Sequence, residues 1–208
     1  MIAERKSLEA QQLQGADPAN IRYRRGEVIW ILTQLGFRGP ASEATFLEYI
    51  KSLRKLGIPF RRGEINLSDR GKGNYSYCHL MELVLVLTLR VYNVVPDALL
   101  LEIIQHRKVL YRYYRRAYTQ RCTGIGAPIS VVVPGGGLLK LRGTFLDLQL
   151  DFSGGRLIKF GPPRLLSPIE ALKIFAHSDI ASRPFLPINL SSLAEKLIAA
   201  TGRAAGWT

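Results

Sequence analysis

Apolar residues recur at helical spacing near the start of the chain. Between Arg25 and Gly36 they repeat with a period near 3.6, which predicts a helix that ends at the glycine. Ser42, a residue type preferred at helix N-caps, predicts the start of a second helix, and Gly57 predicts its end. The buried stripe expected on this second helix consists of Phe46, Tyr49, Ile50, Leu53 and Leu56.

The helical pattern resumes after a short basic, glycine-rich stretch. Residues 58–77 combine a weak alternation with Asp and Gly residues suited to turns, which predicts a small hairpin. A third helix is expected from about Cys78 to Tyr92. Asp97 follows a proline and predicts the start of a fourth helix, expected to be long and to reach about Arg121.

Behind a junction at residues 123–128, the apolar period changes from 3.6 to 2. Three strands are expected near 130–133, 138–152 and 156–160, with glycine-rich hairpin turns between them. Leu146, Leu148, Leu150 and Phe152 are predicted to face one side of the middle strand, and Asp147, Gln149 and Asp151 the solvent side. Two short helices are expected to follow, near Pro168 to His177 and Ser191 to Thr201.

Charge adds the first functional information. The 208 residues include 29 Lys and Arg against 16 Asp and Glu, a net charge of +13. Residues 21–128 hold 18 basic and 8 acidic residues, whereas residues 129–208 hold 9 and 5. Such an excess indicates an anionic partner, nucleic acid before anionic membrane, with the contact concentrated in the front half.

The second helix and the basic hairpin together predict a DNA-binding module. A helix followed closely by a basic hairpin is typical of a winged helix-turn-helix, in which one helix enters the major groove and the wing holds phosphates. The residues expected in the groove are Ser42, Thr45, Glu48, Lys51 and Lys55. Those expected on the DNA backbone are Arg54, Arg61, Arg62, Arg70, Lys72 and Tyr75, with Arg24 and Arg25 as further candidate phosphate contacts.

Three short motifs support this interpretation. IKSLRKLGI at 50–58 is followed by GNYSYCHLMEL at 73–83 and by PDALLLEII at 96–104. Their order resembles the DNA-binding domain of MerR-type transcription regulators, over roughly residues 25–107. The resemblance implies that Lys51 lies at the position of a basic residue that reaches the major groove. It also implies that Tyr75 and Tyr77 fall near the wing tyrosines that contact the DNA backbone.

Residues 107–121, RKVLYRYYRRAYTQR, form a second basic feature with six Lys and Arg and no acid. One interpretation is a helix that packs Leu110, Tyr114 and Tyr118, or that mediates dimerisation. The other is a set of phosphate contacts. Aromatic residues interleaved with basic ones also suit single-stranded nucleic acid, so RNA stays open as a ligand. The candidate phosphate contacts here are Arg112, Arg115 and Arg116.

The sequence offers little for catalysis. Asp147 and Asp151, with Lys159 on the next strand, faintly resemble a metal-dependent nuclease core, but solvent-facing strand acids are the favoured interpretation. Cys78 is expected to be packed rather than redox-active. No motif for nucleophilic catalysis, zinc or a phosphate cradle is present, so we expect no enzyme activity, no metal and no cofactor.

We therefore expect an α+β protein with four parts: a flexible N-terminal tail (1–22), a winged helix-turn-helix DNA-binding domain (23–95), a long basic and tyrosine-rich helix that serves as linker or dimer helix (96–122), and a C-terminal module (129–208). The last is predicted as a small antiparallel β-sheet with two helices, for dimerisation or for binding a ligand or protein partner. No membrane association is expected.

The expected function is sequence-specific binding of double-stranded DNA by a cytoplasmic, nucleoid-associated bacterial transcription regulator. A homodimer is expected because one short recognition helix reads only a few base pairs. The main alternative is a DNA-binding replication, partition or excision factor of a mobile element. An RNA-binding protein and a metal-dependent nuclease are weaker alternatives.

Overall fold

The computed structural model describes residues 17, 18, 20–60, 75–91, 97–123, 129–132, 138–141, 143–153, 156–177 and 185–204. Helices and antiparallel sheets are both present, so the fold is α+β as expected. The contacts divide the chain into two compact units. The first comprises residues 1–104 and 196–208, and the second comprises residues 105–195.

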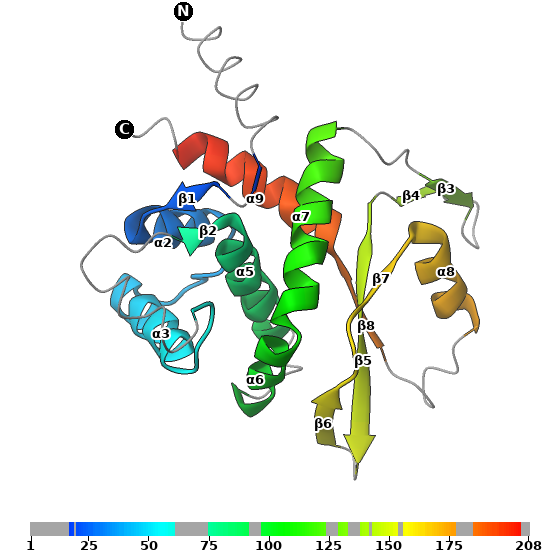
Figure 1. The fold of residues 1–208 in the computed structure, drawn as a ribbon, viewed down its shortest axis with the longest axis horizontal. Coiled ribbons are helices and arrows are strands. Elements are labelled where there is room, and N and C mark those ends of the chain that lie inside the picture. The colour runs from blue at the N-terminus through cyan, green and yellow to red at the C-terminus, as the bar shows by residue number, and fades with distance from the viewer. Residues whose placement is uncertain are drawn as a thin grey trace, which may run out of the picture. The chain divides into compact units, whose positions relative to one another are not determined.

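The first unit is mainly helical (Figure 1). A two-residue strand pairs antiparallel with another about fifty residues later, so that Tyr23 lies opposite Tyr75. Helices occupy most of the described residues between and after these strands. The elements are β1 (Arg22–Tyr23), α2 (Arg25–Gln34), α3 (Glu43–Lys55), β2 (Tyr75–Ser76), α5 (Tyr77–Val91) and α6 (Asp97–Gln105).

Helices α2 and α3 end in the same way, as their glycines predicted. Gly36 and Gly57 have φ of 86° and 88°. The next backbone N–H in each case reaches back to a carbonyl of the last turn, from Phe37 to Leu32 and from Ile58 to Leu53. This is the Schellman motif, which requires one residue in the left-handed backbone conformation. Glycine adopts that conformation without steric cost.

Helix α5 lies at the centre of this unit's core. Eleven of its side chains between Tyr77 and Leu89 are at most 3% exposed, on every side of the helix. A helix that is apolar all round is stable only when other elements cover it. Its neighbours in the first unit contribute buried side chains from one face each, namely Val28, Ile31 and Leu32 from α2 and Phe46, Ile50 and Leu53 from α3.

The second unit is built around the long strand β5 (Phe145–Ser153). Its first residues pair with two strands, so that Asp147 lies opposite Arg164 on one side and Pro187 on the other. Its last residues pair with a third strand. The other elements are α7 (Arg107–Thr123), β3 (Ile129–Val132), β4 (Leu138–Leu141), β6 (Arg156–Phe160), β7 (Arg164–Leu166), α8 (Pro168–His177), β8 (Phe185–Asn189) and the start of α9 (Leu190–Ala204).

The expected solvent exposure of Asp147 is wrong. Leu146, Asp147 and Leu148 are 0%, 2% and 3% exposed, so β5 is covered on both faces here. One carboxylate oxygen of Asp147 accepts a hydrogen bond from the Arg164 guanidinium at 3.2 Å. A buried charge is tolerated when it is paired in this way.

The expected single helix from Asp97 to Arg121 is also wrong, because it is divided at His106 into α6 and α7. The third helix and the last two helices occur where they were expected, within one to three residues at each end. The single strand expected at 138–152 is wrong as well, because it is divided into β4, which pairs with β3, and β5, which lies in another sheet. Strands β1, β7 and β8 were not anticipated. Of the hairpin predicted within residues 58–77, residues 61–74 lie outside the described residues.

Candidate nucleic-acid interface

The start of α3 is set by Ser42. Its hydroxyl oxygen accepts a hydrogen bond from the Thr45 backbone N–H at 3.1 Å and lies 2.8 Å from the Thr45 hydroxyl. This cap satisfies one of the N–H groups that a helix leaves unpaired at its beginning. Ser42 and Thr45 are both exposed. The polar beginning of α3 is therefore well ordered and open to solvent.

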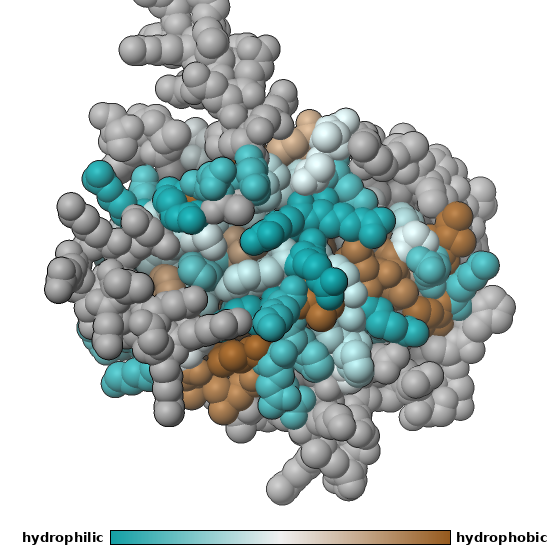
Figure 2. All heavy atoms as spheres, viewed as in Figure 1, coloured by the Kyte–Doolittle hydropathy of each residue, from teal (hydrophilic) through white to brown (hydrophobic). Residues whose placement is uncertain are grey.

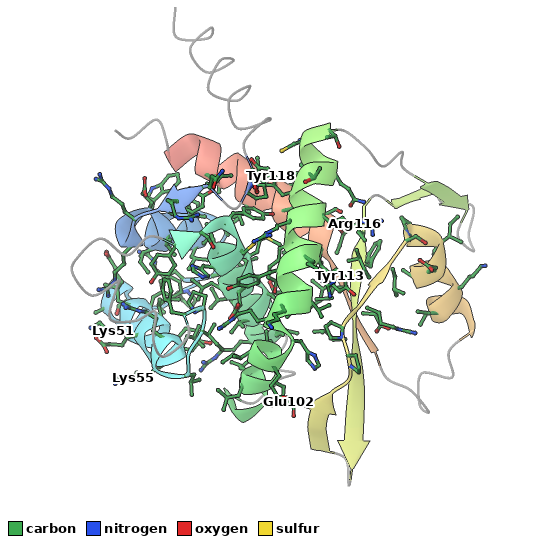
Figure 3. The ribbon with its side chains drawn as sticks, in the orientation of Figure 1. Lys51, Lys55, Glu102, Tyr113, Arg116 and Tyr118 are labelled. Carbon is green, nitrogen blue, oxygen red and sulfur yellow. The ribbon has the colours of Figure 1, made fainter. Side chains whose placement is uncertain are left out.

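One face of α3 is buried, and the opposite face is exposed and mostly polar. Phe46, Ile50 and Leu53 bury the inner face. The outer face follows the i, i+3, i+4 spacing of one helix side. Figure 3 shows Lys51 and Lys55 extending from this outer side. Its exposed residues are Ala44, Thr45, Glu48, Lys51, Ser52 and Lys55. We call this set the α3 face.

The α3 face carries one internal ion pair. The Lys51 ammonium donates to the Glu48 carboxylate, one turn earlier in the helix. That hydrogen bond, together with the positive charge of Lys51, lowers the pKa of Glu48 below its ordinary value. Both groups remain largely exposed. Lys51 and Glu48 can therefore separate and bind other groups, because no buried charge would be left without a partner.

Arg25, at the start of α2, belongs to the same region in space. Its charge contributes to the lowered pKa of Glu48 and opposes the upward shift of the pKa of Tyr75. Arg24 and Arg25 are both exposed. The start of α2 is separated from α3 in the sequence, but its basic residues therefore lie beside those of α3.

Tyr75 requires a correction. Only 2% of its surface is exposed, and its ring packs edge-on against Phe60 with centroids 4.7 Å apart. Burial raises the pKa of its hydroxyl. The side chain thus belongs to the core of the first unit, as does that of Tyr77, which is 1% exposed. The DNA-backbone contacts expected of both tyrosines are withdrawn. The same Phe60 ring lies 5.8 Å from the guanidinium carbon of Arg54, which is half-buried.

A second cation–π contact was not anticipated from the sequence. The Arg90 guanidinium, at the end of α5, lies 3.9 Å above the ring of Tyr49 on α3. This contact fastens α3 to the central helix from its partly buried side. Tyr49 was expected in the buried stripe, and its half-buried position, with the ring covered by a cation, is consistent with that expectation.

The remaining predicted contacts divide into two groups. Arg61, Arg62, Arg70 and Lys72 lie outside the described residues. Arg112, Arg115 and Arg116 lie in the second unit, on the exposed side of α7, whose hydrophilic surface is visible in Figure 2. Among the described residues of the first unit, the structure brings together the α3 face, Arg54 and the two arginines at the start of α2.

Other candidate chemistry receives little support. Cys78 is buried, as expected of a packed thiol. Register places Asp151 opposite Lys159, but Asp147 is paired with Arg164. Across the described residues, no three His, Cys, Asp or Glu side chains are grouped as metal ligands. Nor is any described helix both long and apolar enough to span a bilayer.

Comparisons with known proteins return no match. No protein-family model matches this chain, and no curated protein or solved structure shows significant similarity to it. The resemblance to MerR-type regulators therefore stays a prediction. Any function has to be argued from the geometry and charge of the surfaces described above.

Proposed function

We propose that this protein binds double-stranded DNA in a sequence-specific manner, as a bacterial transcription regulator that acts as a homodimer. The observation that carries the proposal is the α3 face: a capped helix with one apolar side fixed in the core and one polar side open to solvent. A helix of this kind fits the major groove, which is about 12 Å wide.

The side chains of the α3 face are of the types that read base edges. A lysine donates to the acceptors of guanine, a glutamate accepts from the amino group of cytosine, and a threonine contacts several bases. Lys51, Glu48 and Thr45 offer these three functions on one side of the helix. In this proposal, DNA replaces the exposed contact between Lys51 and Glu48.

Positively charged groups beside α3 suit the DNA backbone. In this proposal, Arg24, Arg25 and Arg54 hold phosphates, which fixes a protein on the duplex without reading sequence. We propose that residues 61–74 form the wing of a winged helix-turn-helix, with Arg61, Arg62, Arg70 and Lys72 as further phosphate contacts. The order of α2, α3, that basic segment and α5 supports this arrangement and its likeness to MerR-type regulators.

The decisive experiment selects binding sites from random duplex DNA with the full chain, and then measures affinity for the selected site and for a scrambled one. Lys51→Ala should weaken the selected site more than the scrambled site, by about 1–3 kcal/mol of lost discrimination. An inverted repeat among the selected sites would support the homodimer.

Lys196→Ala is the matched control, because Lys196 is an exposed lysine of the first unit that lies on α9. It removes the same charge and should leave discrimination unchanged. Equal losses on both duplexes for Lys51→Ala would show that α3 does not read bases. A selection that enriches no sequence would overturn sequence-specific binding itself.

A further inference from the structure

We propose that the exposed stripe of α7 formed by Lys108, Arg112, Arg115 and Arg116 is a second surface for nucleic acid, one that holds duplex phosphates without reading sequence. We call these four residues the α7 stripe. They lie in the second unit, away in the sequence from the α3 face. The choice of duplex DNA as ligand rests on the proposed function.

Helical geometry places the four cations on one side. Lys108, Arg112 and Arg116 follow each other at intervals of four residues, which corresponds to a rise of about 6 Å per step. Arg115 lies beside Arg116, and all four side chains are exposed. Figure 3 shows Arg116 on this helix. Along the roughly 12 Å that they span, a DNA duplex presents about seven phosphate charges.

None of the four has an ion-pair or hydrogen-bond partner in the described part of the chain. This distinguishes them from Arg121 on the same helix, whose guanidinium lies 3.3 Å from the carboxylate of Glu195. Like charges three or four residues apart destabilise a helix, and an ordinary solvated face mixes both signs. Within the described part of the chain, no acid pairs with the α7 stripe to relieve this repulsion.

The helix that carries the stripe is held firmly within the second unit. The Tyr113 hydroxyl donates to the Pro163 carbonyl at 3.3 Å, and the Thr144 hydroxyl donates to the Gln120 side-chain oxygen at 2.6 Å. The Arg121–Glu195 pair adds a third contact. Because the backbone of α7 is already ordered, only the side chains of the stripe would lose conformational freedom when they meet an anion, which limits the entropic cost of binding.

Three other partners fit the stripe less well. A membrane-surface helix needs a free apolar side, but Leu110, Tyr114, Ala117 and Tyr118 of α7 are buried. A second copy of the stripe would bring like charges together, so the stripe does not suit a symmetric contact with itself. Single-stranded bases need open aromatic rings, and Tyr111 and Tyr113, the tyrosines of α7 that are not fully buried, are both half-buried.

The test replaces the three arginines by glutamine, a good helix former, in the full chain. Affinity is measured against salt for the selected duplex and for a scrambled one. The Arg112→Gln/Arg115→Gln/Arg116→Gln variant should bind both duplexes more weakly by the same factor. The slope of log affinity against log salt should become shallower by about 2.7, or about 0.9 for each lost phosphate contact.

Two control variants separate charge from structure. Replacing the same arginines by lysine keeps the charges and should restore most of the slope, because lysine binds phosphate as a point charge. Arg121→Gln removes one charge from the same helix, but one that is already paired, and should change the slope least. Circular dichroism of each variant checks that the helices remain formed.

An unchanged slope in the glutamine variant would overturn the proposal. So would a loss seen only with the selected site, only with single strands, or only with vesicles of phosphatidylserine. The two proposals fail separately. If no sequence is selected but the glutamine variant still shows the shallower slope on random duplex, sequence reading by α3 fails and the α7 surface stands.

Discussion

The α3 face and the α7 stripe are both exposed sides of well-anchored helices, yet their charges are arranged differently. On α3, Lys51 and Lys55 alternate with Thr45, Glu48 and Ser52, and one lysine is paired with the glutamate. The α7 stripe has cations only, without a partner among the described residues. Mixed donors and acceptors can distinguish bases, whereas cations alone attract any phosphate chain. The arrangement of charge on each helix, more than the net charge of +13, separates the two roles.

The largest effect is expected from breaking the scaffold beneath α7. Gly143 has φ of 91°, and an added Cβ would lie 2.2 Å from the Cβ of Ser191. Gly143→Ala should lower the free energy of unfolding by roughly 2–5 kcal/mol, from left-handed strain and overlap together. Because Thr144 beside it bonds Gln120 of α7, the sequence-independent part of DNA binding should weaken most. Denaturant unfolding and salt-dependent binding measure the two effects.

Gly36→Ala provides the matched change in the first unit. Gly36 has φ of 86° but no atom within 4 Å of an added Cβ, so only backbone strain of about 1–2 kcal/mol is expected. It should disturb the connection into α3 and reduce discrimination between DNA sites. Equal destabilisation by the two alanines would mean that the contact between Gly143 and Ser191 relaxes freely.

High pH should act on the first unit through Tyr23, next to Arg24 and Arg25. Burial raises the pKa of its hydroxyl from 10.0 to about 12, and a hydrogen bond with Thr201 partly opposes this shift. A raised folded-state pKa gives stability that is complete below pH 10 and is lost as pH rises towards 12. The loss should approach about 2–3 kcal/mol, measured by denaturant unfolding across this range.

Tyr23→Phe tests whether that pH dependence belongs to Tyr23. The variant loses the hydrogen bond to Thr201, at a cost of about 1 kcal/mol near neutral pH. Above pH 10, the free energy of unfolding of this variant should fall less steeply with pH. If the free energy of unfolding fell as steeply as in the unchanged protein, the loss of stability at high pH would come from other groups.

The smallest effect is expected from making the α3 face more like the α7 stripe. Glu48→Gln removes the acid and releases Lys51 from its ion pair. Affinity for scrambled duplex should rise, with a salt slope steeper by at most about one, and discrimination should fall. Glu170→Gln is the control, since Glu170 is an exposed carboxylate of the second unit whose pKa is also lowered, by hydrogen bonds from Ser167. If both variants bind alike, Glu48 lies away from the DNA.

The parts of the fold that depend on local chemistry could be predicted from the sequence. The start of α3 at Ser42 and its end at Gly57 follow from capping and from the left-handed preference of glycine, and both are confirmed. The buried stripe follows from the helical period. These signals lie within one or two turns of the residues that they control, so no knowledge of distant segments is needed.

The errors concern residues whose surroundings come from far along the chain. Tyr75 was expected at an exposed wing, but Phe60 covers its ring. Asp147 was expected on a solvent-facing side, but β7 and β8 flank β5 and the residue is buried beside Arg164. Alternation along a strand shows that two faces differ in character, but it does not show whether both are covered. The approach of Arg25 to Glu48 could not be predicted for the same reason.

The last helix has a practical consequence for dissecting the molecule. Residues 196–208 belong to the first unit, and within them Thr201 bonds the hydroxyl of Tyr23. Residues 105–195 are therefore inserted, in terms of chain order, between two segments of the first unit. A fragment that stops after α6 would lack part of its own core, however well it matched a DNA-binding domain in sequence. A sounder minimal fragment would retain residues 196–208 together with residues 1–104, with a linker in place of residues 105–195, and so would keep both segments of the first unit.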